Sequence, residues 1–290
     1  EKLDAVSFDN FIAQIDPFKN DVDVFDLSVV KFISPAALVQ LSATCYALKE
    51  KGRELKIIFD DPAVCSYLAR AGFVSILKSL VKFEPQDIED SIYNHLRGSN
   101  PLLIEVTKIE KGTELPNLLN KIVSVLRHRL KYRKYDAFDV ATVISEICQN
   151  TFDHNKSTCG FLAMQVYGKG TKRFLEIGVA DYGDGLSKTL QRNPKNKGIK
   201  SDLAAIDFAI KPGTSEHDDP TRGTGLYHLL EIAYKYEGAV QIRSGEGKVR
   251  YRMDMRQGWK APVAYIPGVQ IALSLGHKKR VDKSDKDDTL

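Results

Sequence analysis

The chain is poor in cysteine, methionine and tryptophan, and it has no long apolar run. Its 290 residues include four cysteines, three methionines and one tryptophan. No two cysteines form a C-x-x-C pair, so a zinc cluster is not expected, and so sparse a set does not indicate a disulfide framework. No stretch approaches the roughly 20 apolar residues that span a bilayer, and the charged residues Glu1, Lys2 and Asp4 break any signal-peptide pattern. These absences predict a folded cytoplasmic protein that does not associate with membranes.

Charge is distributed unevenly along the chain. Residues 1–97 hold 11 lysines and arginines against 15 acidic residues, whereas residues 98–290 hold 31 against 23, so the net charges are −4 and +8. The net positive charge of residues 98–290 favours an anionic ligand or an acidic partner. Nucleic acid is not expected, because no dense basic stripe with interleaved aromatic residues is present.

The first third of the chain alternates strand and helix patterns. The stretch 35–49 has helical spacing with one apolar face, and Ser34 and Pro35 suit its N-cap and first turn. Strands are predicted at 22–27 and 56–59, and a second helix at 62–71. This order predicts a small α/β domain over residues 1–97, which ends in the turn-rich residues 97–101.

The remaining patterns predict a second domain over residues 102–276 and a charged, disordered tail at 277–290. The order of its elements predicts a sandwich with helices on one face of a mixed sheet, so the whole chain is expected to be a two-domain α/β protein. The predicted strands are 102–106, 160–167, 174–180, 239–243, 248–255 and 269–275, the predicted helices are 115–130, 137–153, 202–210 and 226–236, and a polar connection runs from 185 to about 200.

Three polar side chains form a separate stripe on the predicted helix 137–153. Glu146, Asn150 and His154 lie at i, i+4 and i+8. A carboxylate and a carboxamide one turn apart offer hard oxygen ligands, and Mg²⁺ takes few of these because it keeps waters and adds substrate phosphates. An ordinary solvated helix face gives the same pattern, so the stripe alone does not decide.

A carboxylate follows the predicted strand 174–180. Asp181 is followed at alternate positions by Gly183 and Gly185. Such glycines let a planar base approach the backbone, and Asp181 can accept a hydrogen bond from an exocyclic amine. A plain turn between two elements is the alternative.

Glycines also precede the predicted helix 226–236. The segment runs Arg222, Gly223, Thr224, Gly225, Leu226. Unpaired N–H groups and the positive end of the helix dipole at such a start form a phosphate cradle. Arg222 adds a fork of donors for a terminal phosphate, and the preceding polar stretch suits a mobile lid. A flexible loop ahead of a helix is the alternative.

In this order and spacing, the three segments resemble the nucleotide-binding boxes of the GHKL (Bergerat-fold) superfamily, which includes gyrase, ATP-driven chaperones, histidine kinases and MutL. The resemblance covers about residues 102–276. It implies ATP and Mg²⁺ as cofactors, with Asn150 on the metal and Asp181 on the adenine amine. Glu146 would orient or deprotonate water or an acceptor hydroxyl. The two glycine segments would shape the lid and the phosphate site.

Within that superfamily the chain is most similar to the anti-sigma-factor serine kinases. They share the E-x-x-x-N-x-x-x-H helix and an arginine just before the second glycine box, here Arg222. Gln270 stands where many members have threonine, so the resemblance does not extend to that adenine-side contact. His128 has no acidic residue directly after it, and the phosphoacceptor box of a sensor kinase is therefore not evident.

Residues 1–97, which we call the front segment, resemble another family. Residues 26–38 are similar to the core of STAS domains, the anti-sigma-factor antagonist fold, as are residues 51–57 and 68–73. In that family a helix opens with two hydroxyl residues, but Pro35 and Ala36 occupy those positions here and have no hydroxyl to accept phosphate. The resemblance implies a degenerate STAS-like module that serves as a docking or regulatory surface.

Three functions follow from these resemblances. The first is an ATP/Mg-binding regulatory protein that phosphorylates Ser or Thr of a protein partner, such as a sigma factor, a STAS protein or another regulator. The second is an ATPase whose hydrolysis drives a conformational or dimer-gating cycle, in which the chain is a homodimer. The third is a non-catalytic interaction module that holds ATP as a structural ligand. The first is the leading hypothesis, and the sequence does not decide what happens to the γ-phosphate.

Overall fold

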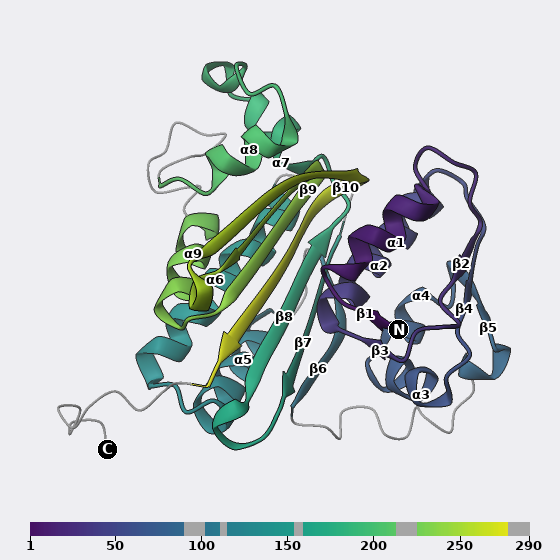
Figure 1. Ribbon diagram of the computed structural model, residues 1–290, viewed down its shortest axis with the longest axis horizontal. Coiled ribbons are helices and arrows are strands. Elements are labelled where there is room, and N and C mark those ends of the chain that lie inside the picture. Colours follow the sequence, from purple (N-terminus) through teal and green to yellow (C-terminus); the bar gives the residue numbers. More distant parts are fainter. Residues whose placement is uncertain (90–101, 111–114, 154–158, 213–224, 278–290) are drawn as a thin grey trace.

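A five-stranded sheet forms the centre of the molecule, with helices on both of its faces (Figure 1). The structure, a computed structural model, describes residues 1–89, 102–110, 115–153, 159–212 and 225–277. It is a mixed α/β fold. The predicted domain boundary at 97–101 and residues 278–290 of the predicted tail lie outside the described residues.

The central sheet has the strand order β6-β7-β8-β10-β9. All four neighbouring pairs are antiparallel, so the prediction of a mixed sheet is wrong here. Side chains alternate between the two faces of each strand, and each face meets its own apolar cluster. The strands are β6 (Leu103–Ile109), β7 (Gly160–Tyr167), β8 (Phe174–Asp181), β9 (Ala239–Arg252) and β10 (Gln257–Gly276).

One face of the sheet packs on three helices, α5 (Leu115–Arg129), α6 (Lys134–Asp153) and α9 (Gly225–Lys235). Their apolar faces have helical spacing, and the side chains of Leu126 and Leu229 are completely buried. These helices and the inward residues of the strands form the larger apolar core. We call this side of the sheet the helix face.

The opposite face, which we call the front face, is covered by α1 (Ser7–Ile15) and α2 (Pro35–Glu50). The helices of residues 102–276 in the described ranges contribute to the helix-face cluster, as predicted, whereas the front face is covered by helices from residues 1–50. The helix α2 is not amphipathic: 13 of its 16 residues are buried, because it lies between two sheets. Ser42 and Thr44 bond back to helix carbonyls at 2.8 Å, which satisfies their buried hydroxyls. The predicted N-cap is confirmed, since Ser34 Oγ accepts from the amide of Ala37.

Beyond α2 lies a parallel three-stranded sheet in the order β2-β4-β5. Its apolar cluster is shared with the central sheet, because Phe161, Ala180 and Tyr182 belong to it. Most members of this cluster lie in residues 3–88, and residues of the central sheet complete it. The remaining front elements are β1 (Lys2–Leu3), β2 (Val24–Asp26), β3 (Phe32–Ile33), β4 (Leu55–Ile58), α3 (Pro62–Arg70), α4 (Phe73–Leu77) and β5 (Val81–Glu84).

One further segment differs from the predicted pattern, and the reversal within another agrees with it. The predicted polar connection at 185–200 begins with a helix, α7 (Gly185–Gln191), and α8 (Asp202–Ala209) follows. β9 reverses direction at Gly245, which has a left-handed φ of 56°. The amide of Met253 consequently donates to the carbonyl of Gly238 at 2.9 Å, so the two ends of this strand lie side by side.

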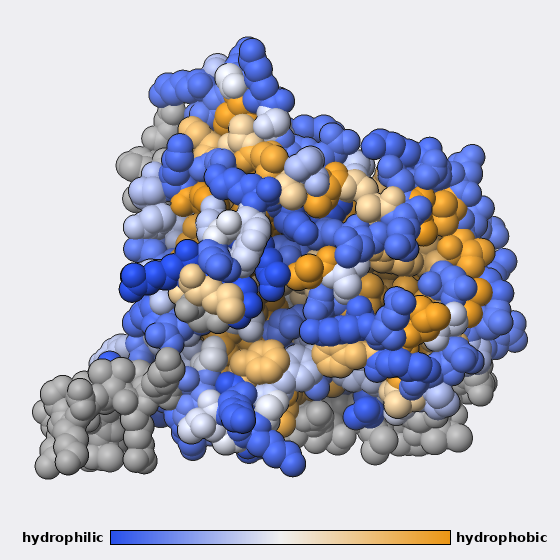
Figure 2. All heavy atoms as spheres, in the orientation of Figure 1, coloured by the Kyte–Doolittle hydropathy of each residue, from blue (hydrophilic) through white to orange (hydrophobic). Residues whose placement is uncertain are grey.

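The surface is mostly polar. Figure 2 shows hydrophilic residues over much of one face, with hydrophobic residues in separate groups over the front segment and near α7 and α8. None of the helices in the described ranges has the length and hydropathy of a transmembrane span.

Candidate nucleotide site

The helix α6 carries the first two predicted site residues. Val140, Ile144 and Ile147 bury its inward face, which leaves Glu146 and Asn150 half-buried on another stripe. His154, the third member of the predicted stripe, lies outside the described residues.

Glu146 meets the first residue of α9. A Cβ atom at Gly225 would lie 2.9 Å from Cδ of Glu146 and 3.1 Å from its Oε1, so only a glycine lets this carboxyl come so near the start of α9. The structure therefore brings together two residues that are 79 positions apart in the sequence. Leu226 follows and is buried in the helix-face core. Arg222, Gly223 and Thr224 lie outside the described residues.

Asp181 is a buried carboxylate at the last position of β8. Only 6% of the residue is exposed. The amide of Gly183 donates to its Oδ1 at 2.8 Å, and the amide of Val269 donates to the same carboxylate. Burial outweighs these bonds and raises the pKa of Asp181 to about 6.

The ends of α6 and β8 meet across Gly160. A Cβ atom at this glycine would lie 2.9 Å from Oγ1 of Thr151, the residue after Asn150. Gly160 is the register partner of Asp181 in the antiparallel β7–β8 pair. Asn150 and Asp181 therefore belong to one region of the helix face.

The turn after Asp181 is held by β9 and β10. Gly185 has a φ of 76°, which suits glycine. A Cβ atom there would lie 2.9 Å from Oγ of Ser244, and this oxygen accepts from the amide of Leu186 at 2.9 Å. A Cβ at Gly268 would collide with the backbone and carboxylate of Asp181. Sequence reasoning missed Ser244, and no local pattern around it marks it as a site residue.

Gln270 has a different position from the one that the resemblance implied. Its register partner Ala180 belongs to the front-face cluster, so by alternation Gln270 also projects to the front face. Its Nε2 donates to the backbone carbonyls of Asp181 and Pro267 at 3.2 and 2.8 Å. Val269, which packs on the helix-face cluster, is the strand residue beside the Asp181 carboxylate.

A groove of about 780 Å³ runs between α6 and α9. Neither Glu146, Asn150 nor Asp181 lines it. At one end Lys235 pairs with Asp136 at 2.9 Å and with Asp139 at 3.7 Å. Its lining residues are Asp139, Thr142, Val143, His228, Leu230, Glu231, Ile232, Tyr234, Lys235 and Met253.

The described residues hold no group of three or more His, Cys, Asp or Glu that could bind a metal by themselves. The oxygen donors Glu146 and Asn150 nevertheless fit Mg²⁺, which commonly takes one or two protein oxygens and completes its shell with waters and phosphates. A metal at this position would therefore depend on a bound nucleotide.

No protein-family model matches the chain, and no curated protein matches it.

Proposed function

We propose that this chain binds ATP with Mg²⁺ in a GHKL-type site on the helix face. The main support is the approach of Gly225 to the Glu146 carboxyl, because it joins the predicted asparagine box to the second glycine box. These boxes are recognised separately in the sequence, and a chance pattern gives no reason for them to meet. The junction of α6 and β8 at Gly160 adds Asp181 to the same region.

Each residue has a defined role in this proposal. The Asp181 carboxylate accepts a hydrogen bond from the adenine amine, and Asn150 supplies one oxygen to the metal. The first amides of α9, which begins at Gly225, face the phosphates with the positive end of the helix dipole. Arg222, Gly223 and Thr224 remain sequence-based members of the phosphate site.

For the γ-phosphate we propose transfer to a serine or threonine of a protein partner, as the likeness to anti-sigma-factor kinases implies. Glu146 would activate the acceptor hydroxyl. The front segment offers no acceptor at the helix start, since Pro35 and Ala36 lack hydroxyls and are buried. Hydrolysis that drives a conformational cycle and binding without turnover are the two alternatives.

Calorimetric titration with ATP and Mg²⁺ tests the binding proposal. Asp181→Asn is expected to abolish measurable affinity, because it removes the charged acceptor of the adenine amine. Asp21→Asn is a matched control, since the Asp21 side chain is fully exposed in the front segment. Unchanged affinity in Asp181→Asn, with the same unfolding curve as the wild type, excludes the adenine role.

Transfer and hydrolysis are separated with γ-labelled ATP. Label on a partner protein, lost in Glu146→Ala, supports a kinase. Partner-free release of phosphate, lost in the same variant, supports an ATPase instead. Intact ATP after long incubation with candidate partners supports a non-catalytic module.

A further inference from the structure

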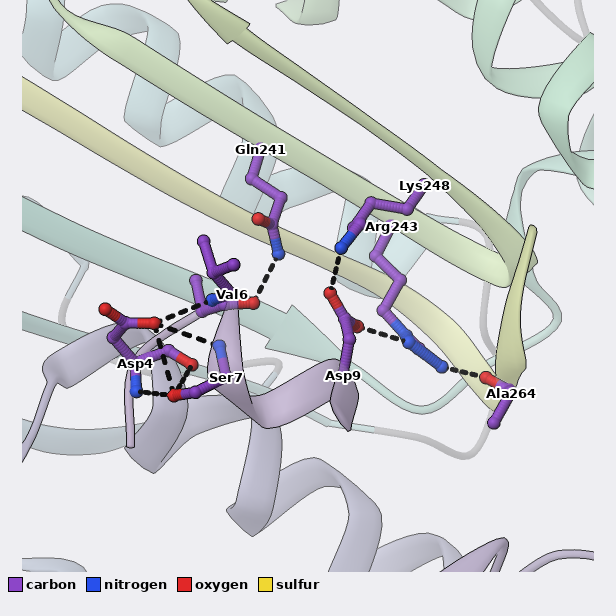
Figure 3. Close-up of polar contacts among 9 residues, drawn as sticks. Asp4, Val6, Ser7, Asp9, Gln241, Arg243, Lys248 and Ala264 are labelled. Atoms are coloured by element: carbon purple, nitrogen blue, oxygen red, sulfur yellow. Dashed lines mark hydrogen bonds and ion pairs between the residues drawn. The ribbon is translucent and has the colours of Figure 1, made fainter. Parts of the chain in front are cut away.

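Three side chains of β9 hold the helix α1 on the front face of the sheet (Figure 3). Gln241 Nε2 donates to the carbonyl of Ala5 at 2.6 Å. Arg243 Nη1 donates to Oδ1 of Asp9 at 2.7 Å, and Lys248 Nζ donates to Oδ2 of the same carboxylate at 2.5 Å. One carboxylate of α1 therefore engages two cations of the sheet.

The contact of Asp9 with Arg243 is buried, so it fixes the position of α1 relative to β9. Asp9 is 5% exposed and Arg243 is completely buried. Burial lowers the pKa of Arg243, whereas the nearby Asp9 charge opposes that change. Arg243 Nη2 also donates to the carbonyl of Ala264 in β10. A charge that is bound in this way cannot move without leaving a buried partner unpaired.

The next residue of β9 faces the opposite side of the sheet. Neighbouring strand residues project to opposite faces, so Arg243 points toward α1 and Ser244 points toward α7. Ser244 Oγ accepts from the amide of Leu186 in the first turn of α7. A single step along β9 thus connects Asp9 of the front segment to the turn that follows Asp181.

We propose that docking of α1 positions the turn at residues 183–186 through Asp9, Arg243 and Ser244, and so controls the nucleotide affinity of the site. The effect on nucleotide rests on the proposed function, whereas the mechanical link does not. A protein partner that loosens α1 from β9 would lower the affinity of the site on the other face. The front segment then acts as a regulatory part of the nucleotide site.

The first test measures hydrogen exchange of the Leu186 amide in nucleotide-free protein. Asp9→Asn is expected to speed this exchange about fivefold or more, because it weakens the bond that aligns Arg243 and hence Ser244. Asp21→Asn, which removes an exposed front-segment charge, is expected to leave the rate unchanged. An unchanged rate in folded Asp9→Asn protein overturns the proposal.

A double-variant comparison separates coupling from general loosening. Ser244→Ala removes the acceptor for Leu186 but keeps the pair between Asp9 and Arg243. Asp9→Asn is then expected to add no further exchange at Leu186, whereas additive effects would contradict the link. If Asp9→Asn does not fold, Asp9→Glu replaces it, because it keeps the negative charge but shifts the carboxylate that aligns Arg243, and the same increase in exchange is expected.

The second test measures ATP affinity by calorimetry in the same variants. Asp9→Asn is expected to raise the Kd for ATP with Mg²⁺ about fivefold or more, and Asp21→Asn is not. If the wild type binds no ATP, the proposed function fails while the exchange result still decides the link. If the wild type binds ATP and folded Asp9→Asn binds equally well, control of affinity by α1 is refuted.

Discussion

At the scale of single residues, Asp181 combines burial with a strand-end position. Its pKa of about 6 lies above the ordinary value of 3.8, so the folded protein favours the protonated form. The contribution of this group to folding stability is therefore fully present below pH 3.8 and is lost as pH rises through about 6. Near neutral pH the carboxylate is charged and buried, which suits a group that accepts a ligand's hydrogen bond.

The raised pKa predicts a pH-dependent affinity. Binding of ATP is expected to weaken by up to about tenfold for each pH unit below 6, because protonation removes the charged acceptor. Calorimetry between pH 5 and pH 8 measures this effect. Constant affinity across that range would contradict the assignment of Asp181, and Asp21→Asn should follow the wild-type curve.

Gly225 provides a test of the contact with Glu146. Gly225→Ala places a methyl group 2.9 Å from Cδ of Glu146, so the carboxyl must move. We expect phosphate transfer or hydrolysis to fall by about tenfold or more. Stability should change by only about 1 kcal/mol, since alanine favours a helix. Single-turnover kinetics and urea unfolding measure the two effects.

The control for this variant is Gly198→Ala, because nothing lies within 4 Å of a Cβ at that position. It should retain wild-type turnover. Full turnover in Gly225→Ala would mean that the Glu146 carboxyl is not needed where the structure places it.

At the scale of elements, the backbones of α2 and β8 approach each other closely. A Cβ atom at Gly178 would lie 2.6 Å from Cα of Ala36. Because Cα is a backbone atom, no change of side-chain rotamer can relieve this clash. Two positions earlier on the same face, Glu176 Oε1 accepts from the amide of Ala36 at 3.3 Å. The first turn of α2 is thus packed directly on this strand.

This contact predicts a stability loss in Gly178→Ala. The added methyl group must separate α2 from β8, at a cost of about 1–3 kcal/mol. Urea unfolding followed by circular dichroism measures the change, and Gly198→Ala again serves as the unaffected reference. Equal stability of the two variants would show that α2 does not pack so closely in solution.

At the scale of the whole molecule, the front segment and the central sheet share one apolar cluster. Phe161 and Ala180 of the sheet contribute to the same buried cluster as the front residues Phe8 and Leu41. The helix-face cluster, in contrast, contains only residues between Ile104 and Leu275.

The fragment of residues 102–276 keeps the helix-face cluster but loses the cover of its front face, so we expect it to be less stable than the full chain. Without α1 and α2, its front-face residues Val106, Phe161 and Tyr182 become exposed to solvent. We expect this fragment to aggregate or to bind a hydrophobic dye strongly. The full chain should instead unfold in one calorimetric transition, with equal calorimetric and van't Hoff enthalpies. A soluble fragment with a sharp transition of its own would support the predicted two-domain organisation.

Local patterns in the sequence were sufficient for most helices and strands. The helices containing Glu146 and Leu229 and the strands before Asp181 follow from hydrophobic period, because each buries one face against one neighbour. Ser34 was identified as an N-cap since capping depends on residues three positions apart. The site residues Glu146, Asn150, Asp181 and Gly225 follow from residue type and spacing together with the resemblance to the GHKL nucleotide-binding boxes.

Only the tertiary structure decided what depends on contacts between distant segments. The burial of α2 on nearly every side comes from its place between two sheets, which no helical period encodes. The side of the sheet to which Gln270 projects is set by strand register. The link from Asp9 through Arg243 to Ser244 joins residues more than 230 positions apart. The sequence by itself determined the elements and the chemical groups of the site, whereas packing decided which of these groups meet, because strand pairing and shared cores depend on the whole chain.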